Sequence, residues 1–341
     1  MTTPERRATS AEDALALAQR AGIHRIALPT PFLVGRVNCY LIEDEPLTLI
    51  DTGPNSGKSL DDLERALAAH ELRVEDLELI VVTHQHMDHL GLLEILARRS
   101  GAEVAAISLL APYLANFTQS AAADDDFARA IMRRHGVPDD LATVLAELAA
   151  AFRAFGSSGA VTRELNDGDE LVLRDRTLRI HHRPGHSPSD TILWDTDREL
   201  LIAGDHLLGR ISSNPVVSRP LSGPADQPRP RALLQYIDSM RATREMPARL
   251  VLPGHGDPIL AHAELIDDRL RMHRRRADRI LHVLDAGPLN AHEIALRMWG
   301  NVAVTQAYLT LSEVLGHLDL LVESGQVAER DRDGIAVFEA L

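Results

Sequence analysis

The chain has 341 residues, of which 45% are hydrophobic and 25% charged, and its formal net charge is −14. These values exclude a wholly disordered chain, and the acidic charge disfavours binding to nucleic-acid phosphates. No run of about 18 apolar residues suggests a membrane span. The N-terminal segment lacks the apolar core of a secretory signal. The single cysteine, Cys39, cannot form an internal disulfide, so we expect a cytoplasmic protein.

Short runs rich in Val, Ile and Leu recur along the chain, and each is followed by a Gly, Pro or His turn. Such runs are typical of strands that are buried on both faces. They predict strands over residues 37–42, 47–50, 79–82, 178–180, 191–194, 200–203 and 250–252. Helical spacing predicts helices between them, over residues 59–69, 90–99 and 231–244. Strands mixed with helices indicate a layered α/β domain.

The segment from about residue 108 to 155 interrupts this pattern. It is Ala-rich with helical spacing, and it holds four of the six phenylalanines of the chain. We expect a helical insertion, which either packs on the main domain as a plain helix pair or caps a pocket and selects apolar substrates. A Pro- and Arg-rich loop at residues 212–230 is either a mobile rim of an active site or a long connection.

The pattern changes again beyond residue 274. Helices are predicted over residues 274–285, 290–299 and 307–323, and two short β-like runs follow at 326–330 and 335–339. Three helices and a hairpin outline a winged helix, so we expect a catalytic domain at 1–273 and a winged-helix-like domain at 274–341. The third helix carries Glu313, Asp319 and Glu323 but no Lys or Arg. Because reading DNA requires a positive face, a docking, lid or homodimerisation role is favoured.

The strongest chemical signal is the segment 83–89, Thr-His-Gln-His-Met-Asp-His, which directly follows the predicted strand 79–82. A strand would place alternate side chains on opposite faces, whereas a loop at a strand end allows His84, His86, Asp88 and His89 to converge. Imidazole and carboxylate are the ligands expected for zinc or a similar divalent ion. The segment therefore predicts a metal site.

Four further candidates follow other predicted strands, directly or after a short Gly turn. They are Asp51 before Thr-Gly, His186 in Pro-Gly-His, Asp205 in Gly-Asp, and His255 in Pro-Gly-His. Strand ends in a layered α/β domain lie along one edge, so these groups can form one site with the segment 83–89.

This ordered series of motifs resembles the metallo-β-lactamase superfamily over roughly residues 26–260. The resemblance implies an αββα sandwich with two metal ions at the edge of its sheets. Carried over by position, His84, His86 and His186 would hold the first ion. Asp88, His89 and His255 would hold the second, with Asp205 bridging the two. Asp51 would orient a ligand without binding metal.

The resemblance also implies a chemistry. Two divalent ions, zinc by default and manganese or iron as alternatives, would hold a bridging hydroxide that attacks a carbonyl or phosphoryl centre. Asp88 would deliver a proton to the leaving group, which makes Asp88 and Asp205 the candidate catalytic residues. Because zinc β-lactamases lack a bridging Asp at the position of Asp205, the resemblance favours the glyoxalase II, lactonase, thioesterase and nuclease branches. The C-terminal outline is similar to that of the lactamase-β-like endoribonuclease and several thioester hydrolases.

We therefore expect a hydrolase that cleaves a thioester, lactone or other ester-like bond of a small apolar substrate. The alternative is a phosphodiesterase or ribonuclease, and a metal-binding regulator without catalysis is a third class. Histidines outside the motif are expected to matter less. His181, His182 and His206 are candidates for orienting a ligand, whereas His70, His135, His273 and His317 are expected on the surface. Cys39 is expected to be a buried apolar residue.

Overall fold

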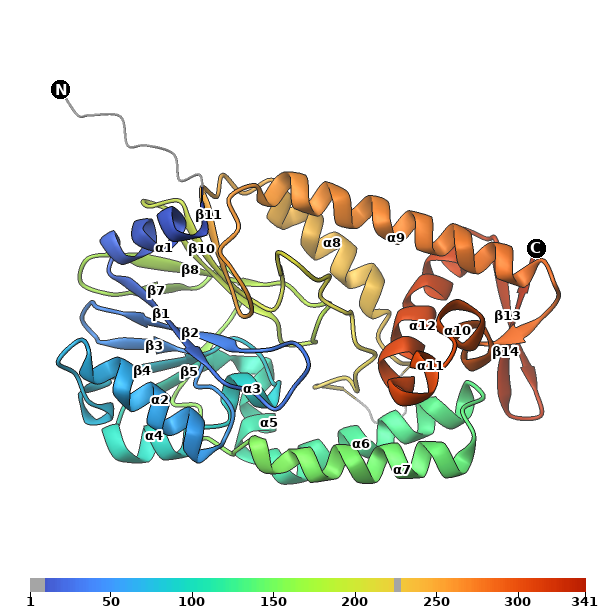
Figure 1. Ribbon diagram of the computed structural model, residues 1–341, viewed down its shortest axis with the longest axis horizontal. Coiled ribbons are helices and arrows are strands. Elements are labelled where there is room, and N and C mark those ends of the chain that lie inside the picture. Colours follow the sequence, from blue (N-terminus) through green and yellow to red (C-terminus); the bar gives the residue numbers. More distant parts are fainter. Residues whose placement is uncertain (1–9, 224–227) are drawn as a thin grey trace.

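Figure 1 shows the computed structural model, which describes residues 10–223 and 228–341. Residues 1–9 of the N-terminal segment assessed for a secretory signal, and residues 224–227 of the loop 212–230, lie outside the described residues. Two β-sheets pack face to face, and helices cover their outer sides. This arrangement confirms the predicted α/β fold of the metallo-β-lactamase type.

The first sheet has six strands in the order β1-β2-β3-β4-β5-β6. Its strands are β1 (Ile23–Leu28), β2 (Val37–Ile42), β3 (Thr48–Ile50), β4 (Leu79–Val82), β5 (Glu103–Ile107) and β6 (Arg163–Leu165). The first three strands pair antiparallel, and those from β3 to β6 pair parallel. Parallel pairing requires a crossover between strands, and helices supply most of these connections.

The second sheet has five strands in the order β11-β10-β9-β8-β7. Its strands are β7 (Glu170–Val172), β8 (Thr177–His182), β9 (Thr191–Asp195), β10 (Leu200–Gly204) and β11 (Leu250–Pro253). Only the pair β10 and β11 is parallel. The ends of β10 and β11 therefore lie at the same edge of this sheet.

Both faces of the central strands are buried, which explains their continuous apolar sequences. In β4, Leu79 and Val81 pack between the two sheets, whereas Ile80 and Val82 pack toward the outer helices. In β10, Ile202 packs between the sheets and Leu201 packs outward. The central core of the molecule is thus the layer between the sheets.

Helices pack on the outside of each sheet. Those that follow strands of the first sheet are α2 (Gly57–Ala68), α3 (Met87–Leu90) and α4 (Leu93–Ser100), while α1 (Ala11–Arg20) precedes β1 and packs against it. Helix α8 (Ala232–Arg244) and the first part of α9 (His262–Leu284) cover the second sheet. No helix in the described part of the chain combines the length and the apolar composition that a membrane span requires.

The segment 108–155 is helical, as predicted, and consists mainly of α5 (Ala111–Ala115), α6 (Phe117–Arg134) and α7 (Asp139–Phe152). Helices α6 and α7 pair and extend from the sandwich toward the C-terminal elements (Figure 1). Met132, Val137 and Ala142 belong to the same apolar cluster as residues of α10 and α12. The insertion therefore connects the sandwich to the C-terminal part of the chain.

The C-terminal elements follow α9 in the predicted order. They are β12 (Leu289–Asn290), α10 (Ala291–Trp299), α11 (Val302–Thr305), α12 (Ala307–Glu323), β13 (Val327–Arg332) and β14 (Ile335–Ala340). The first helix differs from the prediction, because α9 begins at His262 rather than at residue 274. Its buried residues, among them Ile266, His273, Ala277 and Ile280, form one continuous stripe that keeps the helix unbroken.

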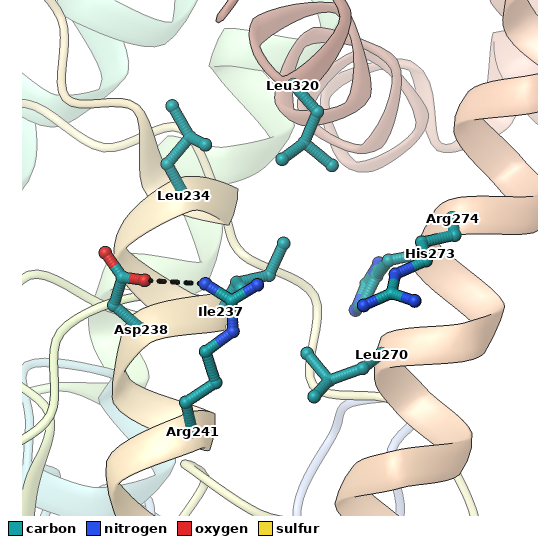
Figure 2. Close-up of a pocket in the computed structure, with 8 residues that line it drawn as sticks. All are labelled: Leu234, Ile237, Asp238, Arg241, Leu270, His273, Arg274 and Leu320. Atoms are coloured by element: carbon teal, nitrogen blue, oxygen red, sulfur yellow. Dashed lines mark hydrogen bonds and ion pairs between the residues drawn. The ribbon is translucent and has the colours of Figure 1, made fainter. Parts of the chain in front are cut away.

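Three histidines that we expected on the surface are buried, so that prediction is wrong for His135, His273 and His317. His273 and His317 face each other between α9 and α12, with Nδ1 of the first 3.2 Å from Nε2 of the second. Figure 2 shows His273 beside a hollow of about 200 Å³ that Leu234, Leu270 and Leu320 help to line. Burial lowers the pKa of His135 and of His273 to about 3, so both imidazoles are neutral.

Candidate metal centre

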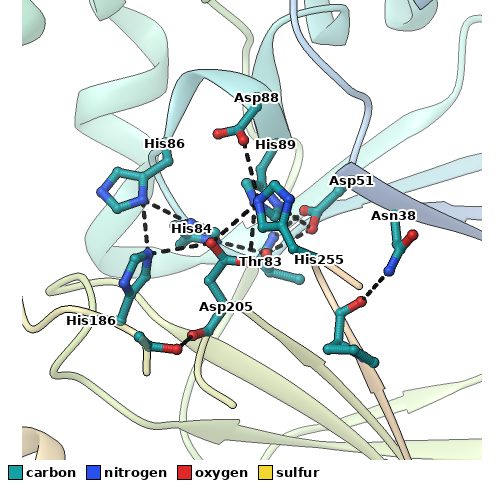
Figure 3. A network of polar contacts seen from close by, with 12 residues as sticks. Asn38, Asp51, Thr83, His84, His86, Asp88, His89, His186, Asp205 and His255 are labelled. Carbon is teal, nitrogen blue, oxygen red and sulfur yellow. Dashed lines mark hydrogen bonds and ion pairs between the residues drawn. The ribbon is translucent and has the colours of Figure 1, made fainter. Parts of the chain in front are cut away.

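The predicted site residues meet at one edge of the sandwich, where several strands end (Figure 3). His84 and His86 lie in the loop between β4 and α3, and Asp88 and His89 lie in the single turn of α3. The other predicted ligands are His186 between β8 and β9, Asp205 after β10 and His255 after β11. The structure thus brings together all seven residues that the sequence proposes as metal ligands. Their donor atoms form two groups, His84–His86–His186–Asp205 and Asp88–His89–His255.

Three imidazole nitrogens converge in the first group. Nδ1 of His86 lies 3.1 Å from Nε2 of His84 and 3.0 Å from Nε2 of His186. A tetrahedral zinc ion with nitrogen ligands at 2.0–2.1 Å would place those nitrogens about 3.3 Å apart. Small side-chain adjustments would therefore suffice to place these three nitrogens around one ion.

Asp205 lies between the two groups. Its Oδ1 is 3.5 Å from Nε2 of His89, and its Oδ2 is 3.5 Å from Nε2 of both His186 and His255. The same Nε2 of His255 is also 3.3 Å from Oδ2 of Asp88. One carboxylate thus faces donors from both groups, as a bridging ligand would.

The second nitrogen of several of these imidazoles is tied to an oxygen atom. Nδ1 lies 2.8 Å from Asp51 Oδ2 in His89, 3.1 Å from the Asn214 carbonyl in His186, and 2.8 Å from the Arg36 carbonyl in His255. A proton on Nδ1 satisfies each of these contacts and leaves the Nε2 lone pair for a metal ion. The two carbonyl oxygens were not foreseen, because any residue type supplies one.

Asp51 supports ligands in both groups. Its backbone has a φ of 60°, in the left-handed region that non-glycine residues seldom adopt. Its carboxylate accepts hydrogen bonds from the Thr83 N–H and O–H, both at 2.8 Å, as well as facing His89. Oγ1 of Thr83 is in turn 3.0 Å from Nδ1 of His84. Thr83 begins the motif in the sequence, yet its part in this network was not predicted.

Burial and charge set the protonation of the cluster. Burial and the neighbouring imidazoles hold the pKa of His84 well below its usual range, and the same causes lower that of His86 to about 3. For His89, burial opposes the charged form, but the carboxylates of Asp205, Asp51 and Asp88 outweigh it and raise the pKa. Burial likewise opposes ionisation of Asp205, yet His255 and His89 hold its pKa well below the usual range. The cluster therefore attracts positive charge.

Two polar atoms of the cluster lack a hydrogen-bond partner in the described structure, and a metal ion could serve as the partner of both. Nε2 of His89 and Oδ1 of Asp205 are buried and have no hydrogen-bond partner among the described residues. Such an atom costs about 1–3 kcal/mol when it stays unpaired, and a cation between the groups would satisfy both. A Cβ atom at Gly254 would lie 2.3 Å from Asp205 Oδ1, so glycine keeps this space open. The residues fit divalent metal ions.

Replacing Asp51 by asparagine is expected to weaken metal binding by about 10–100-fold. The amide cannot accept all the hydrogen bonds that the carboxylate accepts from Thr83 and His89. Competition with a chromophoric chelator measures the affinity of both proteins. The control is Asp169→Asn. Asp169 lies in an exposed turn, where its carboxylate accepts a hydrogen bond from the Asn166 N–H. Equal affinities of wild type and Asp51→Asn would contradict the supporting role.

Metal loading is expected to release protons. In the metal-free protein the carboxylates raise the pKa of His89 and of His255, although burial opposes both shifts. The pKa of His89 lies well above its usual value, so its imidazole carries a second proton at neutral pH, and a metal ion must displace that proton. Metal affinity should accordingly fall as the pH is lowered. Calorimetric titration with zinc in buffers of different ionisation enthalpy measures the released protons, and heats that are independent of the buffer would contradict this expectation.

A cavity of about 600 Å³ opens onto the cluster and is mainly apolar. It is bordered by His86, Asp88, His186, Asp205 and His255. Its apolar walls come from the β1–β2 loop, the helical insertion, the loop after β10 and α12, and include Phe32, Phe117, Phe127, Met132, Phe152, Val217, Tyr308 and Leu309. The helical insertion thus forms a wall beside the candidate metal centre.

The remaining candidates have partners away from the cluster. Nε2 of His206 lies 2.9 Å from Thr243 Oγ1, and Nε2 of His182 lies 2.8 Å from the Pro188 carbonyl. His181 faces Asp167 at 3.9 Å. Cys39 is buried, as predicted, and burial raises the pKa of its thiol. The described structure therefore ties neither His182 nor His206 to a predicted metal ligand.

Comparisons with known proteins agree with this geometry. The family model for the metallo-beta-lactamase superfamily matches residues 33–255. The probable metallo-hydrolase YqjP of Bacillus subtilis (strain 168) is 32% identical over 296 residues, which are 87% of this chain and 91% of that protein. The chain is also similar to the crystal structure of a beta-lactamase domain protein from Burkholderia ambifaria, with a TM-score of 0.79 and 27% sequence identity. The superposition covers 94% of this chain and 92% of that protein's chain.

A shorter similarity concerns a protein with a stated substrate. The human acyl-coenzyme A thioesterase MBLAC2 is 49% identical over 41 residues, which are 12% of this chain and 15% of that protein. The family match and the relative that spans most of this chain agree with the metal-ligand chemistry of the cluster. The chain therefore belongs to the metallo-beta-lactamase superfamily and is a metal-dependent hydrolase.

Proposed function

We propose that this hydrolase works with two zinc ions, one held by His84, His86 and His186 and the other by Asp88, His89 and His255. Asp205 would contact both. The division of the donor atoms into two groups, with Asp205 of the first group facing donors of both, supports this proposal. When bound, such ions stabilise developing negative charge on oxygen and lower the pKa of water. Metal analysis would distinguish zinc from manganese or iron, which accept similar ligands.

We propose that the substrate is a small apolar thioester, lactone or other ester. The observation that carries this proposal is the apolar cavity of about 600 Å³ beside the cluster. Burial of an acyl chain stabilises the complex by about 0.8 kcal/mol per methylene, so these walls favour apolar acyl groups. The local similarity to an acyl-coenzyme A thioesterase supports the thioester in particular.

In this proposal Asp88 transfers the proton. Its carboxylate borders the cavity and is held ionised, because His89 and His255 outweigh the effect of burial and lower its pKa. It can therefore accept a proton from the attacking water and give it to the departing thiolate or alkoxide. Asp205 would hold the two groups of ligands together, and the apolar walls would exclude water from the acyl chain.

We further propose that residues 1–273 form the catalytic domain and residues 274–341 a winged-helix module. Helices α10 and α12 and the hairpin of β13 and β14 support the second assignment. Helix α9 crosses the proposed boundary. The module contributes Tyr308 and Leu309 to the cavity, which suits a wall of the substrate site better than a surface for nucleic acid.

A substrate panel tests this function. Zinc-loaded protein would be assayed with butanoyl and dodecanoyl thioesters, a homoserine lactone, bis(p-nitrophenyl) phosphate and RNA. We expect hydrolysis of acyl thioesters or lactones and none of RNA. Cleavage of RNA or of the phosphodiester without cleavage of any thioester or lactone would overturn the proposal in favour of the phosphodiesterase alternative.

Narrowing the cavity is expected to change chain-length selectivity. Ala128 on α6 lines the cavity, and a tryptophan there would displace about three methylenes of a long acyl chain. Loss of their burial, about 2.4 kcal/mol, would lower kcat/KM for a dodecanoyl thioester about 50-fold and leave a butanoyl thioester little changed. Ala130→Trp, at an exposed position of the same helix, is the control. An equal loss with both substrates would contradict this role of the wall.

A further inference from the structure

A second group of potential metal ligands lies outside the site described above. It consists of His24 in β1, Glu43 just after β2 and His70 just after α2. Nε2 of His24 is 3.3 Å from Glu43 Oε2, and Nδ1 of His70 is 2.7 Å from Glu43 Oε1. The two imidazole rings meet edge to face, with their centroids 4.3 Å apart. Three elements that are separate in the sequence thus direct donor atoms to one point.

One buried nitrogen atom of this group has no hydrogen-bond partner among the described residues. Nε2 of His24 is buried and has no hydrogen-bond partner in the described structure, although it lies near the Glu43 carboxylate. Burial and the nearby His70 lower the pKa of His24, although Glu43 opposes this shift. The lowered pKa favours the neutral imidazole. A neutral imidazole nitrogen beside a carboxylate is an arrangement that a cation between them would complete.

We propose that His24, Glu43 and His70 bind one zinc-like divalent ion, at a site separate from the candidate metal centre. Two imidazoles and one carboxylate are a zinc ligand set, and three protein ligands leave the fourth position to water. Glu43 is 41% exposed, so water has access. The site lies at the end of β2 that is remote from Val37, the residue that pairs with His255.

The spacing of the donors agrees with this proposal. Ligands at 2.0–2.1 Å from a tetrahedral ion lie about 3.3 Å apart, as His24 and Glu43 already do. The contact of His70 with Glu43 is shorter because a proton now occupies it. Both side chains are partly exposed, so they can separate by a few tenths of an ångström when an ion replaces that proton.

A third group with similar donor atoms differs in the partner of its carboxylate. His273, Glu313 and His317 also lie close together, between α9 and α12. There the Glu313 carboxylate is already paired with the guanidinium of Arg276. In the group of His24, Glu43 and His70, the carboxylate of Glu43 pairs with the two imidazoles. Glu43, which pairs with no guanidinium among the residues that the structure describes, is the better ligand for an ion.

Bound zinc is expected to hold the end of α2 against β1 and β2. An ion that binds only the folded state raises its stability by mass action. Zinc should therefore raise the melting temperature further in the wild type than in a protein that lacks these ligands. Binding requires both imidazoles to be unprotonated, so this additional effect should disappear at acidic pH.

The number of zinc ions per chain tests the proposal. Metal-free protein would be equilibrated by dialysis against buffered zinc at about neutral pH, and bound zinc measured by mass spectrometry. The double variant His24→Gln/His70→Gln should bind one ion fewer per chain than the wild type and retain full hydrolytic activity. His282→Gln, which removes an exposed imidazole from a simple pair with Asp285, is the matched control and should bind as many ions as the wild type.

Two further results decide the outcome. Glu43→Gln keeps the shape of the side chain and should also bind one ion fewer, which covers the case in which the double variant folds poorly. Circular dichroism of the metal-free proteins checks that each variant folds. Equal zinc content in wild type and Glu43→Gln, or in wild type and a folded double variant, would overturn the proposal and leave a hydrogen-bonded group without metal.

Discussion

Asparagine at position 205 is expected to lower kcat/KM by about 10³-fold, because one carboxylate faces ligands of both groups. Oδ1 of Asp205 lies 3.5 Å from His89, and Oδ2 lies 3.5 Å from His186 and His255. An asparagine retains one oxygen and no charge, so it cannot serve both sides. Loss of a single well-placed electrostatic contact at a reacting centre commonly costs 10²–10³-fold, and here the metal content should fall as well.

Steady-state kinetics and metal analysis of the same protein samples measure both effects. The control is Asp257→Asn, two residues beyond His255. It removes an exposed carboxylate that pairs with Arg210 and Arg25. This variant should keep the activity and metal content of the wild type. If Asp205→Asn also kept both, Asp205 could not be the residue that connects the two groups.

The candidate metal ligands could be found from the sequence because metal binding requires particular residue types, His and Asp, and these follow predicted strands. A single His or Asp after an apolar strand is common, but here several strands are each followed by one; β10 and β11, for example, end shortly before Asp205 and His255. Strand ends share an edge of the sheet, so the list of residues also predicted their convergence. The resemblance to the metallo-β-lactamase superfamily assigned Asp51 a supporting role, and in the structure Asp51 contacts His89.

The atoms that orient the ligands could be predicted only in part. The carbonyl groups of Arg36 and Asn214 contact His255 and His186, but a backbone oxygen has no signature in the sequence. Thr83 acts through a hydroxyl that donates to the carboxylate of Asp51, a residue distant in the sequence. Such contacts are decided by the tertiary fold rather than by local pattern.

Peripheral elements were also missed, for two physical reasons. Strand β1 carries the polar residues His24 and Arg25 at half-buried positions, so its sequence lacks a continuous apolar run. Strands β6 and β7 have only 3 residues each and begin with charged residues, so, unlike the equally short β3, they lack an apolar run. The burial of the histidines was missed for another reason. His273 lies on the apolar stripe of α9, and only its neighbours in space show that it is neutral and enclosed.

A buried ion pair joins the two sheets at the edge opposite the metal centre. Nε of Arg176, between β7 and β8, lies 3.0 Å from Asp44 Oδ2, just after β2. The side chains are 3% and 0% exposed, and the guanidinium also donates to the Ala21 carbonyl and faces Asp195 at 3.7 Å. The pair therefore connects β2 of the first sheet to the start of β8 in the second.

Removal of this carboxylate by Asp44→Ala is expected to lower the free energy of unfolding by about 3–5 kcal/mol, because Arg176 would keep a buried charge with too few partners. Urea denaturation of the metal-free protein measures the change. Glu45→Ala, which breaks an exposed pair with Arg174, should have little effect. Comparable losses in the two variants would contradict a special role for the buried pair.

The pH dependence provides a second readout of the same pair. Burial opposes ionisation of Asp44, but hydrogen bonds from Arg176 and from the Glu45 and Asp175 N–H groups outweigh it and lower the pKa. Because the folded-state pKa is lowered, the contribution of Asp44 is complete above the ordinary carboxylate pKa and is lost as the pH falls through the folded-state value. The stability difference between wild type and Asp44→Ala should therefore be constant near neutral pH and shrink in acid. A difference that stayed the same in acid would assign the loss to packing rather than to the charge of Asp44.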